Sequence, residues 1–106
     1  GIAYVVSSAG LVILDVSSPE NPVLLGHYQS GYAEEIAVQD RFAFVAEGFN
    51  GLTIIDVADP TDPYVVSRND NRYAVGVAVS ENYAYLVDSE GLKIIEIFIP
   101  VWALRS

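Results

Sequence analysis

The sequence predicts an all-β protein made of repeated short strands, and three observations support this prediction. Motifs recur every 40 to 41 residues, and apolar runs of strand length alternate with turn residues about every 8 to 12 positions. Val, Ile, Tyr and Phe dominate these runs, and none has the 3.6-residue apolar period of a helix. With 106 residues, of which 52% are hydrophobic, the chain has enough apolar content for a packed core.

Two motifs define the repeat. A Gly-Leu motif appears as GLVILDV, GLTIIDV and GLKIIEI, which begin at Gly10, Gly51 and Gly91, spaced 41 and 40 residues apart. An Ala-aromatic motif, AYVV, AFVA and AYLV, precedes each of them by seven or eight residues. The one-residue difference falls between the two motifs, where EGFNG in the second copy replaces SSAG in the first. Because insertions belong in loops, this segment is predicted to be a turn.

The second repeat predicts four strands in chain order, namely YAEEIAVQ, RFAFVAE, GLTIIDV and PYVVSRND. The other two repeats supply matching segments, and polar pairs at positions 40–41 and 81–82 predict turns after the first strand. Prolines lie between the third and fourth strands, where they remove no ladder hydrogen bond. They are Pro19, Pro22, Pro60 and Pro63.

The inner segments of each repeat predict a propeller blade. FAFVA and LTIID are apolar at successive positions, which indicates strands buried on both faces, whereas the fourth strand carries polar residues such as His27 and Arg68. A four-stranded antiparallel sheet that is buried between two neighbours and wet at its outer edge describes a blade of a β-propeller. A β-trefoil is the main alternative, because its three units of about 40 residues also fit this length, but it does not readily explain these inner strands.

The chain contains about 2.6 of these repeats. We assign residues 1–30 to strands two to four of a first blade, residues 31–71 to a complete blade, and residues 72–106 to three strands and a divergent tail. A propeller closes with about four to eight blades, so one chain forms an incomplete ring that leaves apolar surface uncovered. We therefore expect a piece of a longer chain or self-association, with a dimer favoured and a trimer as the alternative.

The two ends of the chain are expected to take part in this association. The tail from Ile99 to Leu104 is expected to supply the outer strand of the third blade. Trp102 lies outside the repeat and is interpreted as an exposed interface anchor, with a packing plug as the alternative. The candidate interface residues are Ile2, Tyr4, Ile97, Ile99 and Trp102.

The repeat unit resembles the LVIVD repeat, and residues 2 to about 97 take part in the resemblance. The Gly-Leu motifs with their following Ile and acidic residues match it, as do the Pro-x-x-Pro pairs of the first two copies. The third copy departs from the pattern, since it has Glu96 instead of Asp and FIPVWALRS instead of the proline-containing turn. The resemblance implies a β-propeller repeat of bacterial or archaeal secreted or surface proteins, and it implies no generic catalytic activity.

The charge and composition exclude several classes of function. With 14 acidic and 5 basic residues, the net charge of −9 leaves no basic surface for nucleic acid. The absence of Cys excludes disulfides, zinc–thiolate sites and a Cys nucleophile. The most apolar stretch, residues 94–104, is too short to span a bilayer and is broken by Glu96 and Pro100, so we expect no membrane insertion.

Acidic residues occur in loops that are expected at one end of a propeller channel. Glu34 and Glu35 stand where the third repeat has Val75 and Gly76, so they depart from the repeat's own pattern, and only one of the two is expected to point into the channel. Carboxylates bind hard cations such as Ca²⁺ and attract basic ligands. The candidate ligand-binding residues are Glu34, Glu35, Glu47, Asp88 and Glu90. The alternative is that they are solvated loop acids that raise solubility.

Other polar residues are interpreted as structural. His27 is the only His, and its place on an outer strand argues against a Ser-His-Asp triad. Asp15, Asp56 and Glu96 recur one per repeat, and we expect them to cap the following turn through backbone N–H groups. We therefore expect a non-catalytic structural or protein-interaction module without a cofactor. A ligand- or cation-binding propeller is the alternative, and a hydrolase has the least support.

Overall fold

The computed structural model describes residues 1–29, 32–69, 73–99 and 104, and in this part of the chain all regular structure is β-strand. This confirms the all-β prediction. The strands are β1 (Ile2–Ser7), β2 (Gly10–Asp15), β3 (Val23–Gln29), β4 (Glu35–Gln39), β5 (Phe42–Ala46), β6 (Leu52–Asp56), β7 (Tyr64–Asn69), β8 (Ala74–Ser80), β9 (Tyr83–Asp88) and β10 (Gly91–Glu96).

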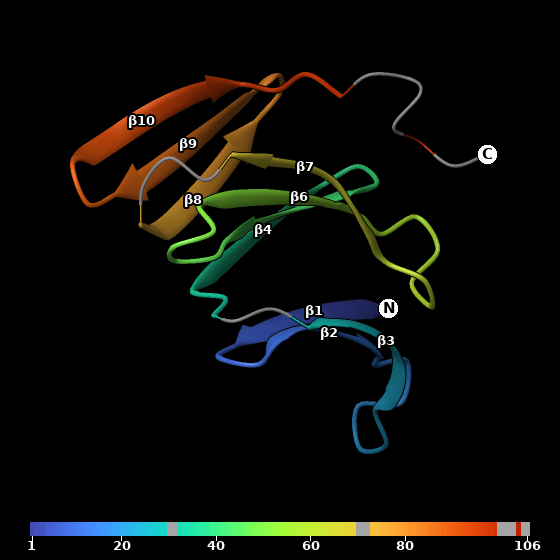
Figure 1. Ribbon diagram of the computed structural model, residues 1–106. Coiled ribbons are helices and arrows are strands. Elements are labelled where there is room, and N and C mark those ends of the chain that lie inside the picture. Colours follow the sequence, from blue (N-terminus) through green and yellow to red (C-terminus); the bar gives the residue numbers. More distant parts are fainter. Residues whose placement is uncertain (30–31, 70–72, 100–103, 105–106) are drawn as a thin grey trace.

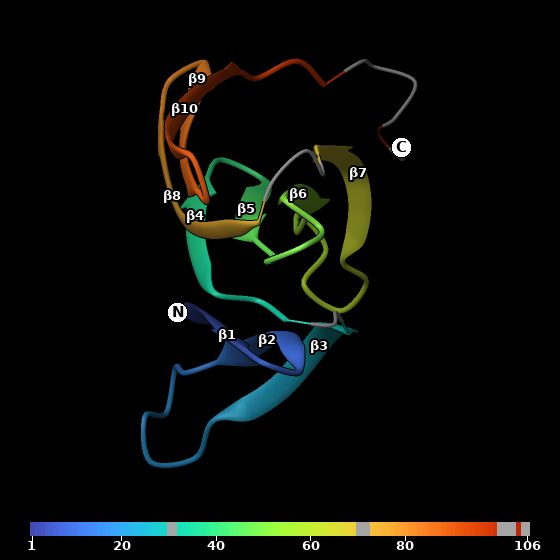
Figure 2. The same ribbon diagram turned by 60° about the vertical axis from the view of Figure 1, so that its left-hand side comes forward.

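These strands form three separate antiparallel sheets, each made from strands that follow one another along the chain. The orders are β1-β2-β3, β4-β5-β6-β7 and β10-β9-β8. Figure 1 shows the sheets one above another, with β8–β10 at the top and β1–β3 at the bottom, and Figure 2 shows the same succession from another side. Face-to-face packing of consecutive meanders agrees with propeller blades and not with the trefoil alternative.

The hairpins between the first two strands of the second and third sheets use the predicted turn positions. Asp40 and Glu81 have positive φ angles of 56° and 53°, which is the left-handed conformation of tight hairpins. Register shifts opposite Ile13/Leu14 and opposite Ile54/Ile55 place a bulge in the outer strand of both repeats, where β3 and β7 each carry one extra residue. Equivalent residues thus adopt equivalent backbone structure.

Two hydrophobic cores fill the spaces between the sheets. The core between the first and second sheets contains Leu11, Ile13, Ala43, Val45 and Ile55. The core between the second and third sheets is formed by Phe44, Leu52, Ile54, Ala74, Val77, Ala84 and Leu86. β6 is buried along its whole length because it has a neighbouring sheet on each face, as the sequence predicted.

The backbone also joins neighbouring sheets where each inner strand begins. The Ala33 N–H donates to Ser7 O (3.1 Å), and at the equivalent place the Ala74 N–H donates to Gly48 O (2.9 Å). These bonds hold the residue that leads into β4 against the end of β1, and the first residue of β8 against the β5–β6 loop. That position defines one end of the assembly, where the candidate site lies.

The predicted turn caps are confirmed for two of the three acidic positions. The Ser17 N–H donates to Asp15 Oδ1 (2.8 Å), and the Ala58 N–H donates to Asp56 Oδ1 (2.9 Å). Asp56 also accepts two hydrogen bonds at Oδ2, from Arg41 Nε (2.9 Å) and from the Tyr64 hydroxyl (3.1 Å). The sequence did not predict this pairing of Asp56 with Arg41.

Candidate functional site

A pocket lies at the loop end of the second sheet. It has a volume of about 400 Å³ and is lined by Tyr32, Glu47, Phe49, Asn50 and Tyr73. The two tyrosines precede the inner strands β4 and β8, and the other three residues belong to the end of β5 and the β5–β6 loop. The pocket therefore forms where the segments that lead into β4 and β8 meet the β5–β6 loop.

The loop backbone holds the pocket wall in place. Gly48 exchanges two backbone hydrogen bonds with Ala74, at 3.0 and 2.9 Å. Gly48 has a positive φ of 56°, and a Cβ at this position would lie 3.3 Å from the Tyr73 ring. A glycine is thus favoured both by the left-handed backbone conformation and by the closeness of the ring. Phe49 lies edge-on to Tyr73, with ring centroids 4.5 Å apart.

Glu47 is the buried acid of this pocket, with an exposed fraction of 1%. Thr53 Oγ1 donates a short hydrogen bond to Glu47 Oε1, and Arg68 Nη2 lies 3.9 Å from the same oxygen. The other oxygen, Oε2, has no hydrogen-bond partner among the described residues. A buried carboxylate with one unsatisfied oxygen is unusual, because desolvation of such a group is costly.

Arg68 connects Glu47 with the first sheet. Its Nη2 donates to the Tyr28 hydroxyl at 2.5 Å, and its Nε donates to Thr53 Oγ1 at 3.3 Å. Burial, followed by the negative charge of Glu47, raises the pKa of Tyr28. Arg68 therefore donates hydrogen bonds to Tyr28 and Thr53 and is also the ion-pair partner of Glu47. Sequence reasoning placed Glu47 at this end but missed Thr53, Arg68 and Tyr28.

Glu34 and Glu35 both contact the third repeat. The Tyr73 hydroxyl donates to Glu34 Oε2 (3.1 Å), and this bond raises the pKa of Tyr73. The Val77 N–H donates to Glu35 Oε1 at 3.4 Å. The alternation expected for the pair does not apply, because β4 begins at Glu35 and Glu34 lies before the strand. Only Glu34 is connected with the pocket, through Tyr73.

Asp88 and Glu90 lie in the equivalent loop of the third repeat. The Glu90 N–H donates to Asp88 Oδ1 at 2.8 Å, so Asp88 closes its own turn. Neither residue lines the pocket at Glu47. The five predicted acids are therefore divided between two loops and an inner strand. Within the described residues, no three His, Asp or Glu side chains are grouped as a metal site requires, and Ca²⁺ binding stays a prediction.

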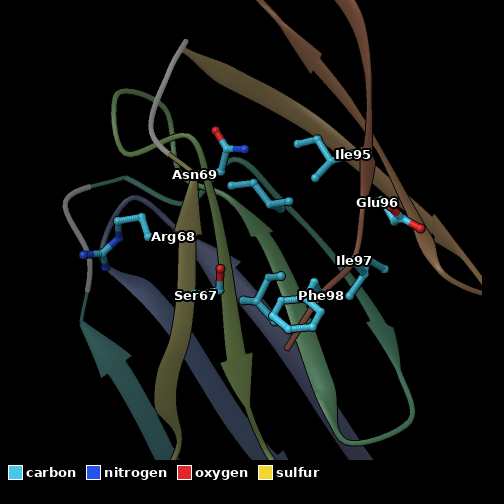
Figure 3. A pocket seen from close by; sticks show the side chains of 9 residues that line it. Ser67, Arg68, Asn69, Ile95, Glu96, Ile97 and Phe98 are labelled. Carbon is cyan, nitrogen blue, oxygen red and sulfur yellow. The ribbon is translucent and has the colours of Figure 1, made fainter. Parts of the chain in front are cut away.

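A second groove runs between β7 and the end of β10. Its volume is about 380 Å³, and Figure 3 shows Ile95 and Ile97 facing it from one side and Ser67 and Asn69 from the other. β10 is the edge strand of its sheet in the described part of the chain. The expected outer strand of the tail falls mainly on residues 100–103, which lie outside the described residues. We interpret the groove as the space beside β10 in which the expected outer strand of the third sheet would lie.

The predicted interface residues are distributed between the cores and the surface. Tyr4 packs on the core between the first two sheets, and Ile97 and Ile99 pack on the core between the last two. Ile2 is exposed, and Trp102 lies outside the described residues. Tyr4 faces inward because alternate residues of β1 face opposite sides of the sheet.

The three stacked meanders define a repeat protein of the β-propeller type. A family model, the LVIVD repeat, matches residues 1–30, 30–70 and 71–98. The chain therefore belongs to the LVIVD-repeat family, as its motifs predicted. No curated protein and no solved structure matches the chain significantly. The part of the chain that the structure describes contains no helix long and apolar enough to cross a membrane.

Proposed function

We propose that the chain is a non-catalytic structural module of a β-propeller, which associates through the open faces of its first and last sheets. The observation that supports this most strongly is the composition of those faces. They carry the same residue positions that pack together between neighbouring sheets inside the chain. The contact we propose is therefore one that the chain already makes twice.

The first internal contact joins β2 to the second sheet. Leu11 and Ile13 pack against a face formed by Ala43, Val45 and Ile55. These five residues are almost completely buried. They define the two halves of a sheet-to-sheet contact.

The second internal contact repeats the first one unit further along the chain. Leu52 and Ile54 occupy the positions of Leu11 and Ile13, and they pack against the third sheet. The residues opposite them occupy the positions of the face described above and are Ala84, Leu86 and Ile95. Both halves of the contact are thus encoded in the repeat.

The third sheet presents the first half of this contact to solvent. Leu92 and Ile94 occupy the positions of Leu52 and Ile54, and their exposed fractions are 68% and 61%. Val87 pairs with Leu92 across the hairpin and is also exposed. Exposed apolar residues gathered on one sheet face indicate a surface that binds a partner.

The first sheet presents the other half. Ala3, Val5 and Leu14 occupy the positions of Ala43, Val45 and Ile55, and Val5 has an exposed fraction of 48%. The two open faces are therefore complementary to each other rather than to themselves. This arrangement favours a head-to-tail contact between copies, and such a contact gives a ring if the rotation closes. We propose a dimer of this kind as the simplest assembly of the isolated chain.

A complementation experiment tests the head-to-tail contact. Val5→Asp blocks the face of the first sheet, and Ile94→Asp blocks the face of the third sheet, because a buried charge in an apolar contact is costly. Each variant alone is expected to be monomeric by light scattering, since every pairing then includes a blocked face. An equimolar mixture is expected to form a dimer through the two unblocked faces.

The control is Ser89→Asp, which adds the same charge at an exposed turn of the third sheet and is expected to leave association unchanged. If Ile94→Asp alone still dimerises, the contact joins two identical faces and the proposal is wrong. A mixture that stays monomeric also contradicts it. Circular dichroism of each variant checks that the sheets are intact.

We propose in addition that the module acts outside the cell. LVIVD repeats are generally found in extracellular proteins, which supports this location. Chains carrying this segment should therefore be labelled by a membrane-impermeant amine reagent on intact cells, whereas labelling only after lysis would contradict the location. Lys93, which is half-buried, is the amine that this segment offers to the reagent.

A further inference from the structure

β10 lies at the edge of its sheet in the described part of the chain, although its counterparts in the other two repeats, β2 and β6, are central strands. Each of those two strands pairs with an outer strand, which is β3 in the first sheet and β7 in the second. The backbone of β10 therefore presents the unpaired N–H and C=O groups of an open edge. Such an edge accepts a further extended strand.

A groove borders this edge where the chain elsewhere has a covering turn. Between the first two sheets, the β6–β7 turn places Pro60 and Pro63 against Gly26 of β3. Ser67 is the counterpart of Gly26, and it borders the open groove of about 380 Å³ opposite Ile95 (Figure 3). The groove therefore corresponds to space that the turn and outer strand of the following repeat fill between the first two sheets.

The second sheet shows which side chains an outer strand contacts on its neighbour. The Tyr64 hydroxyl donates to Asp56 Oδ2 (3.1 Å), and Arg68 Nε donates to Thr53 Oγ1 (3.3 Å). Each of these hydrogen bonds joins two residues that lie opposite each other in the antiparallel register of β6 and β7. The residues of β10 at the positions of Asp56 and Thr53 therefore select the strand that can pair with it.

Glu96 stands at the position of Asp56 but lacks its basic partner. Asp56 is buried and forms an ion pair with Arg41. Glu96 is exposed, and Asn82 stands where the second repeat has Arg41. The described residues supply no ion pair to Glu96. A basic residue on an added strand, at the place of Tyr64, would therefore meet an unpaired carboxylate.

Lys93 stands at the position of Thr53 and reverses the preference of the second contact. Thr53 accepts a hydrogen bond from the guanidinium of Arg68. A half-buried ammonium at the same place repels a base on the opposite strand and attracts an acid. The described residues supply no ion pair to Lys93 either. An acidic residue at the place of Arg68 therefore fits β10 better than arginine does.

We propose that the edge of β10 binds an extended strand from another polypeptide, which runs antiparallel to β10 with a basic residue opposite Glu96 and an acidic residue opposite Lys93. Branched apolar residues and a small residue lie between these two, as Val65, Val66 and Ser67 do in β7. In this mode of recognition the main chain supplies affinity and the side chains supply specificity. The added strand extends the third sheet at its edge, so the proposal does not depend on the face-to-face association proposed above.

Two peptides of identical composition test the proposal. The matched peptide has the sequence of residues 63–70 with Lys in place of Tyr64 and Glu in place of Arg68. The exchanged peptide has these two substituents in the opposite order, which puts like charges opposite Glu96 and Lys93. Fluorescence anisotropy of each labelled peptide, titrated with the full chain, is expected to show that the matched peptide binds at least about fivefold more tightly.

A charge exchange in the protein is expected to reverse this preference. The double variant with Lys93→Glu and Glu96→Lys should bind the exchanged peptide at least about fivefold more tightly than the matched one. Neither the peptides nor the two proteins differ in net charge, so a general electrostatic attraction cancels from the comparison. In ¹H–¹⁵N NMR spectra of the wild type, saturable shifts on addition of the matched peptide are expected at the amides of residues 91–96.

Several results would overturn the proposal. Equal affinity of the wild type for both peptides would show that Glu96 and Lys93 do not select the strand, and so would an unchanged preference in the double variant. Shifts confined to β1, which is also an edge strand, would place the binding on the wrong sheet. If neither peptide binds, the edge is closed to other chains, as it would be if the tail of the same chain covered it. If the double variant does not fold, the preference and the NMR shifts of the wild type decide.

Discussion

Replacing Gly26 by alanine is expected to lower the free energy of unfolding by about 3 kcal/mol, and this is the largest effect that we predict for a single methyl group. Gly26 is buried in β3, where the turn after β6 crosses the first sheet. A Cβ at this position would lie well inside 3.0 Å of the Pro60 carbonyl oxygen and 3.3 Å from Pro63 Cδ. The sheets must separate to admit it, since backbone atoms cannot rotate away.

Gly76→Ala is the matched control, because Gly76 is also a strand glycine. The nearest atom to its added Cβ is Val87 Cβ at 3.6 Å, an ordinary contact. We expect thermal unfolding to show a fall of more than ~10 °C for Gly26→Ala and of less than ~5 °C for Gly76→Ala. Equal melting temperatures would contradict the packing described between the first two sheets. Ser67, the counterpart of Gly26 in the second repeat, borders the open groove and accordingly tolerates a side chain.

Replacing Asp56 by asparagine is expected to cost about 2 to 3 kcal/mol at neutral pH. The side chain of Asp56 has an exposed fraction of 1%, and its Oδ2 lies 2.7 Å from Arg41 Nη2. Asparagine preserves the shape but loses the charge that holds Arg41, Tyr64 and the Ala58 N–H. Asp59→Asn is the control, because Asp59 caps an exposed turn through the Thr61 N–H (3.0 Å) without a charged partner. Urea unfolding of both variants measures the difference.

The same residue predicts how stability depends on pH. Burial alone would raise the pKa of Asp56, but the hydrogen bonds from Ala58, Arg41 and Tyr64 and the charge of Arg41 hold it below the ordinary value. A lowered folded-state pKa gives stability that is present above the unfolded pKa and is lost as the pH falls through the folded value. We expect the melting temperature of the wild type to fall below about pH 4, and that of Asp56→Asn to fall less steeply. If the melting temperatures of the wild type and of Asp56→Asn fall equally steeply at acid pH, Asp56 is not the group responsible.

The repeat made most of the strand architecture predictable. The Gly-Leu and Ala-aromatic motifs located the hairpins, and positions 40 and 81 marked tight turns that the φ angles confirm. The caps at Asp15 and Asp56 followed from short polar side chains placed before proline-containing turns. These features depend on local backbone chemistry, which recurs whenever the local sequence recurs.

The site was less predictable, because it depends on contacts between repeats. Glu47 reads as a solvated loop acid, yet it is buried beside Thr53, Arg68 and Tyr28 of the first sheet. The pairing of Arg41 with Asp56 lies within the second repeat, but it joins a hairpin turn to the end of a strand 15 residues away, so it was not apparent from the local sequence either. One signal for Glu47 was present, namely the extra residue in EGFNG, which frees the side chain from closing its turn.

The solution mass of the wild-type chain tests the central claim most directly. The central claim is that the open faces of the first and third sheets bind each other in the way the internal sheets do. Sedimentation equilibrium between about 1 and 100 µM is expected to show a mass that rises from that of one 11.5 kDa chain to twice that value. A single 11.5 kDa species over this whole range, with the sheets intact by circular dichroism, would contradict the claim.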